Sequence, residues 1–250
     1  MHLMRAHNKQ VLECMKKAGT LLAKIFETIA PIIKPGVTTL QIDAWIAQQQ
    51  KLKGLISCSK GYKGYKHVSC ISVNDTIVHG VPSSYVVQEG DLVKVDVCVR
   101  YKLGCADMAR VFYVGTTIPQ DIQQFIWTAQ QALDAGIAQA ISGNRISDIS
   151  HAVQTIVEKK GYGIVQEFAG HGIGKNMHES PDILNYGNPG KGPLITVGLG
   201  FAIEPMITMG SPEMYIDSDG WTAKTKDRSL AMHVEDTVIV TEHGPEIITR

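Results

Sequence analysis

Apolar residues recur at helical spacing in four stretches of the chain, separated by glycine, proline and polar residues. Positions three and four apart lie on one face of a helix, so this pattern predicts amphipathic helices. We expect these helices at 9–33, 38–53, 119–141 and 147–160. Pro35 and Gly36 end the first helix, and Thr38 with Gln41 is typical of a capping box that opens the second.

Other segments are apolar over shorter lengths and predict strands, at 68–73, 92–99, 105–114, 200–207 and 232–241. The order is therefore two helices, strands, two helices, strands. This order predicts an α+β fold, with two similar halves packed around one antiparallel or mixed sheet. A length of 250 residues is compatible with one domain, so we expect a single catalytic unit over 1–250.

The composition of the chain argues against several classes of protein. Lysine plus arginine and aspartate plus glutamate are equal at 24 each, so neither nucleic acid nor an anionic membrane is expected as a partner. No apolar run approaches the length of a membrane span, and Met1 to Lys17 lacks the apolar core of a signal peptide. The five cysteines form no CxxC pair, which fits a reducing compartment. We therefore expect a soluble, cytoplasmic protein.

Two aspartates, Asp96 and Asp107, lie in neighbouring predicted strands. If Tyr101 and Lys102 form the turn between the strands, the two carboxylates are direct cross-strand partners on one face. Carboxylates placed so close together repel each other unless a cation or a shared proton separates them. The alternative is a surface aspartate on an edge strand and a second aspartate in a turn.

Three more segments carry candidate ligands. The segment GHGIGKNMHES presents His171 and His178 from a glycine-rich loop, although single histidines are more often structural. Glu204 lies between an apolar strand and Pro205, and Glu235 lies in another apolar strand. Each glutamate alone could be an exposed strand residue. Together, acids in apolar strands and one imidazole favour a site for Mn, Fe, Co or Zn.

These motifs, in this order, resemble one family over essentially the whole chain. The matching segments are KPGVTT, GYKGY, SVNDTIVHG, GDLVKVDV, GHGIG followed by His178, FAIEPM and DGWTAKTKDRSLAMHVEDT. They resemble the methionine aminopeptidases of type I. The resemblance implies the pita-bread fold, with two pseudo-symmetric halves around a central sheet that carries two divalent metal ions, the native metal being undetermined.

The resemblance also implies roles for individual residues. The implied metal ligands are Asp96, Asp107, His171, Glu204 and Glu235, with Glu204 also handling the proton of a bridging water. His79 and His178 would act in catalysis and contact the substrate. The implied walls of a methionine-sized pocket are Tyr62, Tyr65, Cys70, Met177 and Trp221, although the three aromatic residues could be ordinary core or rim residues.

The chain departs from the common bacterial pattern of this family at several positions. The departures are Ser59, Lys63, Met108, Met177, His233 and Asp236; His233 and Asp236 stand where glutamine and histidine are more common. None of them removes an implied metal ligand. They affect the shape of the pocket and the relative affinity of the two ions.

The expected activity is removal of the initiator methionine from nascent polypeptides whose second residue is small. The partners would be nascent N-termini, with the ribosome as a candidate place of action, and the enzyme is expected to be a monomer. One alternative is a proline-specific peptidase on the same fold; such relatives usually carry a separate amino-terminal domain, for which we expect no room in this chain. Another is a catalytically inactive protein that binds a partner through its cleft, which would be expected to have lost ligands.

Overall fold

The computed structural model describes residue 4 and residues 6–250; residues 1–3 and 5 of the expected 1–250 unit lie outside the described residues. The helices are α1 (Lys9–Ile29), α2 (Thr39–Leu52), α3 (Gln120–Ala138) and α4 (Ile146–Lys159). Short 3₁₀ turns are η1 (Ala30–Ile32) and η2 (Tyr62–Gly64). The predicted helices are confirmed, with small shifts at their ends.

The helix ends follow from local chemistry. The α1 helix ends at Ile29 rather than at residue 33, because Pro31 lies at the start of η1 and cannot continue an α-helix. At the start of α2, Thr38 Oγ1 accepts a hydrogen bond from the backbone N–H of Gln41, whose side-chain Oε1 in turn accepts from the backbone N–H of Thr38. The predicted capping box is therefore present.

Most strands belong to one sheet. Among the described residues this sheet has nine strands, in the order β1-β4-β5-β14-β9-β7-β8, with β2 also paired to β4 and β15 to β14. Their bounds are β1 (Ile56–Ser57), β2 (Cys70–Val73), β4 (Leu92–Tyr101), β5 (Gly104–Tyr113), β7 (Gly170–Gly172), β8 (Glu179–Ile183), β9 (Gly200–Ile203), β14 (Glu235–Thr241) and β15 (Gly244–Ile247). The pairs recorded within it are antiparallel.

Two smaller sheets complete the strands of the described chain. One has the order β13-β10-β6 and the other β11-β12-β3. Their bounds are β3 (Thr76–Val78), β6 (Gly163–Ile164), β10 (Met206–Thr208), β11 (Met214–Ile216), β12 (Ala223–Thr225) and β13 (Ala231–His233). The single strands predicted at 200–207 and 232–241 are each split in two, at Glu204-Pro205 and at Val234. Pro205 cannot donate to a ladder, which accounts for the first break.

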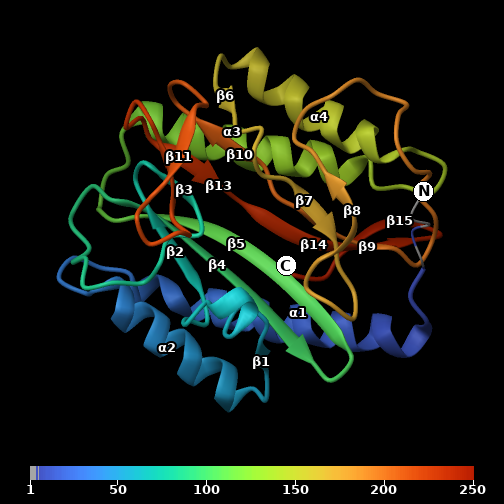
Figure 1. Cartoon of the computed structure of the whole chain (residues 1–250), viewed down its shortest axis with the longest axis horizontal. Coiled ribbons are helices and arrows are strands. Elements are labelled where there is room, and N and C mark those ends of the chain that lie inside the picture. Colours follow the sequence, from blue (N-terminus) through green and yellow to red (C-terminus); the bar gives the residue numbers. More distant parts are fainter. Residues whose placement is uncertain (1–3, 5) are drawn as a thin grey trace.

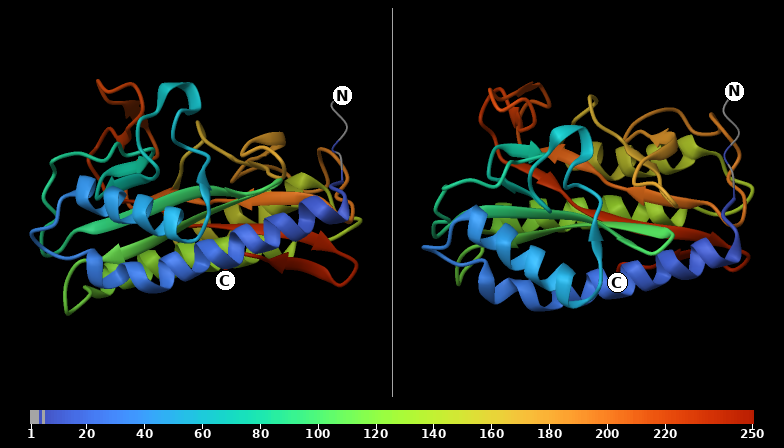
Figure 2. Two further views of the ribbon diagram at one scale, coloured as in Figure 1. Left: turned by 90° about the horizontal axis from the view of Figure 1, so that it is seen from below. Right: turned by 60° about the horizontal axis from the view of Figure 1, so that its bottom comes forward.

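The core divides into two halves. Helix α1 packs against β4 and β5, and helix α3 packs against β9, β13, β14 and β15, each with its own cluster of buried apolar side chains. Figure 1 shows α1 and α2 in the lower part of the view and α3 and α4 in the upper part, with the central strands between them in this projection. In Figure 2, the segments around η2 and β11 rise from the face of the sheet opposite α1 and α2. This arrangement matches the predicted two-half α+β architecture.

The predicted register of the β4–β5 hairpin is wrong. Asp96 pairs with Ala109 and Asp107 pairs with Cys98, because Lys102 and Leu103 form the turn and Tyr101 pairs with Gly104. Lys102 takes a positive φ of 51°, so the turn begins one residue later than expected. Asp96 and Asp107 are therefore diagonal neighbours on one face, not direct partners.

Candidate metal centre

Three carboxylates meet at the centre of the main sheet. Ala109 on β5 pairs with Asp96 on β4 at one side and with Glu235 on β14 at the other, and paired residues face the same side of a sheet. Asp107 is two residues from Ala109 on β5 and so shares that face. The small, buried side chain of Ala109 leaves the space between the acids open.

Two residues from β7 and β9 approach the same point. His171 lies on strand β7 rather than in the loop expected, and Glu204 follows β9 at the break before Pro205. His171 Nε2 lies 3.5 Å from Glu204 Oε1 and 4.0 Å from Asp107 Oδ2. Its Nδ1 lies 3.0 Å from the carbonyl oxygen of Gly172 and donates to it in the neutral tautomer, which leaves the Nε2 lone pair directed at the carboxylates.

The electrostatics of the group are unfavourable without a cation. Burial raises the pKa of Asp96, Glu204 and Glu235 well above the usual range, and raises the pKa of Asp107 to about 7. Repulsion by neighbouring carboxylates adds to the effect at Asp96, Asp107 and Glu235. Among the described residues, Glu235 Oε1 is buried without a hydrogen-bond partner. A divalent cation would remove both penalties, so the residues present fit a metal.

The possible ligand atoms fall into two groups within the described chain. Asp107, His171 and Glu235 form one, and Glu204, His233 and Glu235 form the other; the atoms of each group lie within 4.8 Å of one another. His233 belongs to the second group, although the sequence marks it only as a departure from the family pattern. The sequence feature that could have identified His233 is an imidazole two residues before a candidate ligand.

These acids form the floor of a cavity of about 480 Å³. The five implied metal ligands, His79 and His178, and the five implied pocket residues all line this cavity. The structure therefore brings together every residue expected at the site; their individual roles stay predictions. Ser59 and Lys63 line the cavity as well, whereas Met108 belongs to the core and Asp236 lies on the other face of β14.

Two further histidines, His79 and His178, line the cavity. His178 is exposed; its Nδ1 lies 3.2 Å from the hydroxyl of Tyr62, and its ring meets that of His171 edge to face at 4.4 Å. His79 is half-buried with a φ of 58° and packs edge to face on Phe168 at 5.2 Å. Burial lowers the pKa of His79 to about 4, so its ring is neutral near pH 7. Phe168, which holds this ring, was missed in the sequence.

Aromatic rings build one wall of the cavity. Tyr65 and Trp221 meet edge to face at 5.0 Å, and the Tyr65 hydroxyl donates to the carbonyl oxygen of Ser69 at 2.9 Å. Cys70 and Met177 add apolar surface. The wall is therefore fixed in place and suited to an apolar side chain.

The similarity of the chain to known proteins identifies the class of protein that has this fold and this acidic site. The model of metallopeptidase family M24 matches residues 13–242. The chain therefore belongs to the M24 metallopeptidases, a family of metal-dependent peptidases.

Within this family, its relatives are methionine aminopeptidases. The chain is 39% identical to the methionine aminopeptidase of Clostridium acetobutylicum, over 97% of each chain. The crystal structure of a methionine aminopeptidase from Thermotoga maritima superposes with a TM-score of 0.96 at 36% identity and covers 99% of this chain and 100% of its own. Prolidase from Pyrococcus furiosus, at 22% identity and a TM-score of 0.78, shares the fold over 98% of this chain and 65% of its own. The family and the pita-bread fold expected from the sequence are confirmed.

Among the described residues, no helix has the length and apolar character needed to cross a bilayer. The cysteines, all of which fall within the described residues, are free thiols.

Proposed function

We propose that this protein is a methionine aminopeptidase that hydrolyses the first peptide bond of polypeptides beginning with methionine, where the second residue is small. One observation carries the proposal: a cavity with an apolar aromatic wall ends on buried carboxylates from adjacent strands. Full-length similarity to methionine aminopeptidases supports it.

We assign the metal ligands to Asp96, Asp107, His171, Glu204 and Glu235, which offer enough carboxylate oxygens for two divalent ions. Oxygen-rich ligation with imidazole suits Mn, Fe, Co or Zn. When bound, such ions act as Lewis acids and lower the pKa of a coordinated water to near neutrality.

The chain's own residues supply the remaining steps. Glu204, with a pKa raised by burial, would accept a proton from the attacking water and pass it to the leaving amine. His79 and His178 would donate hydrogen bonds where negative charge develops on the substrate carbonyl. Desolvation lowers the pKa of both rings, that of His79 to about 4. The wall formed by Tyr62, Tyr65, Cys70, Met177 and Trp221 would hold the methionine side chain and exclude water around it.

Cleavage of a defined peptide tests this function. After chelation and re-addition of Co, Mn, Fe or Zn one at a time, a Met-Ala-Ser peptide should release methionine, and an Ala-Pro dipeptide should not react. Release of proline with no release of methionine would instead assign the chain to the proline-specific branch. A protein without stoichiometric metal or turnover would indicate a binding protein.

We further propose that the enzyme acts as a monomer in the cytoplasm on nascent N-termini, including those emerging from the ribosome. Light scattering on a sizing column should give the mass of one chain. Co-sedimentation with translating ribosomes would test the place of action.

A further inference from the structure

The side chain of His233 lies next to Glu204 and Glu235, two of the proposed metal ligands. His233 is the last residue of β13, where it pairs with Met206 on β10, and the main sheet resumes two residues later at Glu235. Its side chain is only 3% exposed. His233 and Glu235 are two residues apart, and both lie near Glu204 and its neighbouring carboxylates.

The two oxygens of Glu204 face two different imidazoles. His171 Nε2 lies 3.5 Å from Oε1, and His233 Nε2 lies 3.3 Å from Oε2. His233 Nε2 also lies 3.9 Å from Glu235 Oε2. Despite these short distances, His233 Nε2 has no partner in hydrogen-bonding geometry among the described residues, and neither has Glu235 Oε1.

A buried imidazole nitrogen without a hydrogen-bond partner lowers the stability of the fold. Buried polar atoms nearly always have a partner, and those without one need an explanation. His233 Nε2 is not in hydrogen-bonding geometry with either of the two acids beside it, so a hydrogen bond to them does not account for its place. A neutral imidazole with a free lone pair is, by contrast, a good metal ligand.

The distances agree with shared coordination. Nitrogen and oxygen ligands lie about 2.1 Å from such ions, which puts neighbouring ligand atoms roughly 3.0–3.5 Å apart. His233 Nε2 and Glu204 Oε2 meet this separation, and Glu235 Oε2 is slightly farther. We propose that His233 is a sixth protein ligand of the centre and binds, through Nε2, an ion that Glu204 and Glu235 also bind.

This ligand gives the centre a second imidazole. Imidazole favours Fe, Co, Ni and Zn over Mn and Mg, so the ion held by His233 should be bound more tightly and should be exchanged less readily for Mn. The inference rests on the proposed function only in its premise that the carboxylates bind metal. It needs no particular peptide substrate.

Counting imidazoles on cobalt tests the proposal directly. Metal-free protein is loaded with two equivalents of Co²⁺, and X-ray absorption at the cobalt edge gives the average number of imidazoles per ion. The wild type should average one, from His171 and His233 together, and His233→Gln should average about one half. Calorimetry should show at least a 10-fold loss of Co²⁺ affinity at one of the two positions, with a smaller loss for Mn²⁺.

Controls separate a ligand from a residue that only supports Glu204. The exposed His243→Gln should match the wild type in both measurements. Should the glutamine variant fail to fold, as judged by circular dichroism, His233→Ala is loaded in the presence and absence of imidazole. Added imidazole should restore the count and the affinity, because a free ring can occupy the vacated place.

An imidazole count that stays at one in His233→Gln or His233→Ala, without added imidazole, overturns the inference even if affinity falls. That result leaves the proposed function intact, since the wild type still binds metal. Absence of Co²⁺ binding by the wild type would instead remove the metal premise of both proposals.

Discussion

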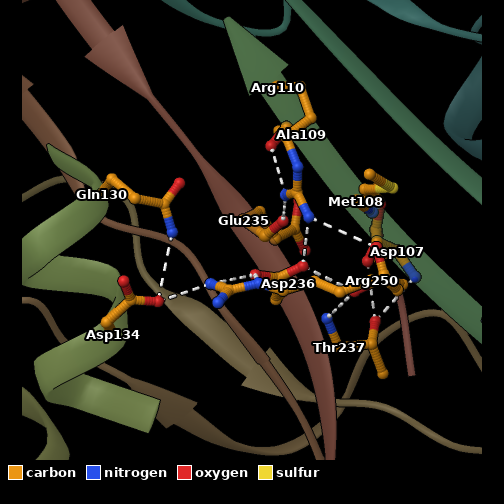
Figure 3. A network of polar contacts seen from close by, with 11 residues as sticks. Asp107, Met108, Ala109, Arg110, Gln130, Asp134, Glu235, Asp236, Thr237 and Arg250 are labelled. Atoms are coloured by element: carbon orange, nitrogen blue, oxygen red, sulfur yellow. Dashed lines mark hydrogen bonds and ion pairs between the residues drawn. The ribbon is translucent and has the colours of Figure 1, made fainter. Parts of the chain in front are cut away.

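Asp236 Oδ2 accepts a hydrogen bond from Arg250 Nε at 2.7 Å, on the face of β14 opposite the acidic cavity. Its neighbour Glu235 lines the cavity, because successive side chains of a strand point to opposite faces. Figure 3 shows that Asp236 also meets Arg110, at 2.5 Å through Oδ1. A fully buried carboxylate with two guanidinium partners thus holds in place the strand that carries Glu235.

Removing this carboxylate should destabilise the protein. In Asp236→Ala the partly buried guanidinium of Arg110 loses its acidic partner. Loss of one partner of a buried ion pair lowers the free energy of unfolding by about 3–5 kcal/mol. Arg250→Met, at a more exposed side chain, should cost only about 1–2 kcal/mol, because Asp236 keeps Arg110 and Thr249. Urea unfolding of the metal-free variants measures both losses of unfolding free energy. A loss below 1 kcal/mol for Asp236→Ala would show that the pair does not support β14.

His79 should contribute to turnover and not to metal binding. His79→Ala is expected to lose about 2–4 kcal/mol of transition-state stabilisation, the scale of one missing donor to a developing oxyanion. Histidine and alanine both carry a Cβ, so the positive φ of residue 79 strains both and the substitution should add little backbone strain. The measurements are kcat/KM on Met-Ala-Ser, metal content and thermal unfolding. Loss of metal from this variant would contradict the assigned role.

The contribution of Asp107 to the stability of the metal-free protein should fall as pH rises. The pKa of Asp107 is about 7 in the folded chain and near 4 when unfolded, so the folded state keeps a proton that the unfolded chain releases. The stabilisation from this group is full below about pH 4 and is lost as pH rises through 7. Over that interval the loss is about 1.4 kcal/mol per pH unit for each such carboxyl.

Divalent metal should reverse this trend, because deprotonated carboxylates bind it and protons compete with it. Thermal unfolding between pH 5 and 8, with chelator and with excess Co²⁺, measures the two slopes. Asp107→Asn removes this titrating group, so the stability of the metal-free wild type relative to the variant should fall between pH 5 and pH 8. A difference in stability between the two proteins that does not change over this interval would contradict the prediction.

Cys58 should be the most reactive thiol at acidic pH. Its Sγ lies 3.7 Å from that of Cys105, and hydrogen bonding from Cys105, then from Cys98, lowers its pKa to about 4. Burial and the thiolate of Cys58 raise the pKa of its two partners. Brief alkylation by iodoacetamide at pH 6, followed by peptide mass spectrometry, should label Cys58 first. Cys105→Ala should shift this labelling to higher pH; equal labelling in both proteins at pH 6 would count against the thiolate.

Local signals in the sequence were sufficient for the four helices and the longer strands, but not for the short strands β1, β3, β6, β7, β8, β11, β12 and β15. The capping box at Thr38 and Gln41 depends on residues three apart, and the apolar period of each helix depends on neighbours within two turns. The predictions were wrong where contacts between distant segments determine the structure. The hairpin turn lies at Lys102-Leu103, one residue from the position expected, and this difference changes every cross-strand pair from Asp96 to Asp107.

The residues that carry the chemistry can be identified from the chain alone: acids in apolar strands and imidazoles among glycines indicate a cation site because bare charges there are costly. How these residues meet depends on the folded arrangement of the strands. Ala109 lies between Asp96 and Glu235, Glu204 lies between two imidazoles, and His233 joins the ligand group. These contacts join residues that lie far apart along the chain, and sheet register and strand breaks, which no local pattern specifies, set their distances.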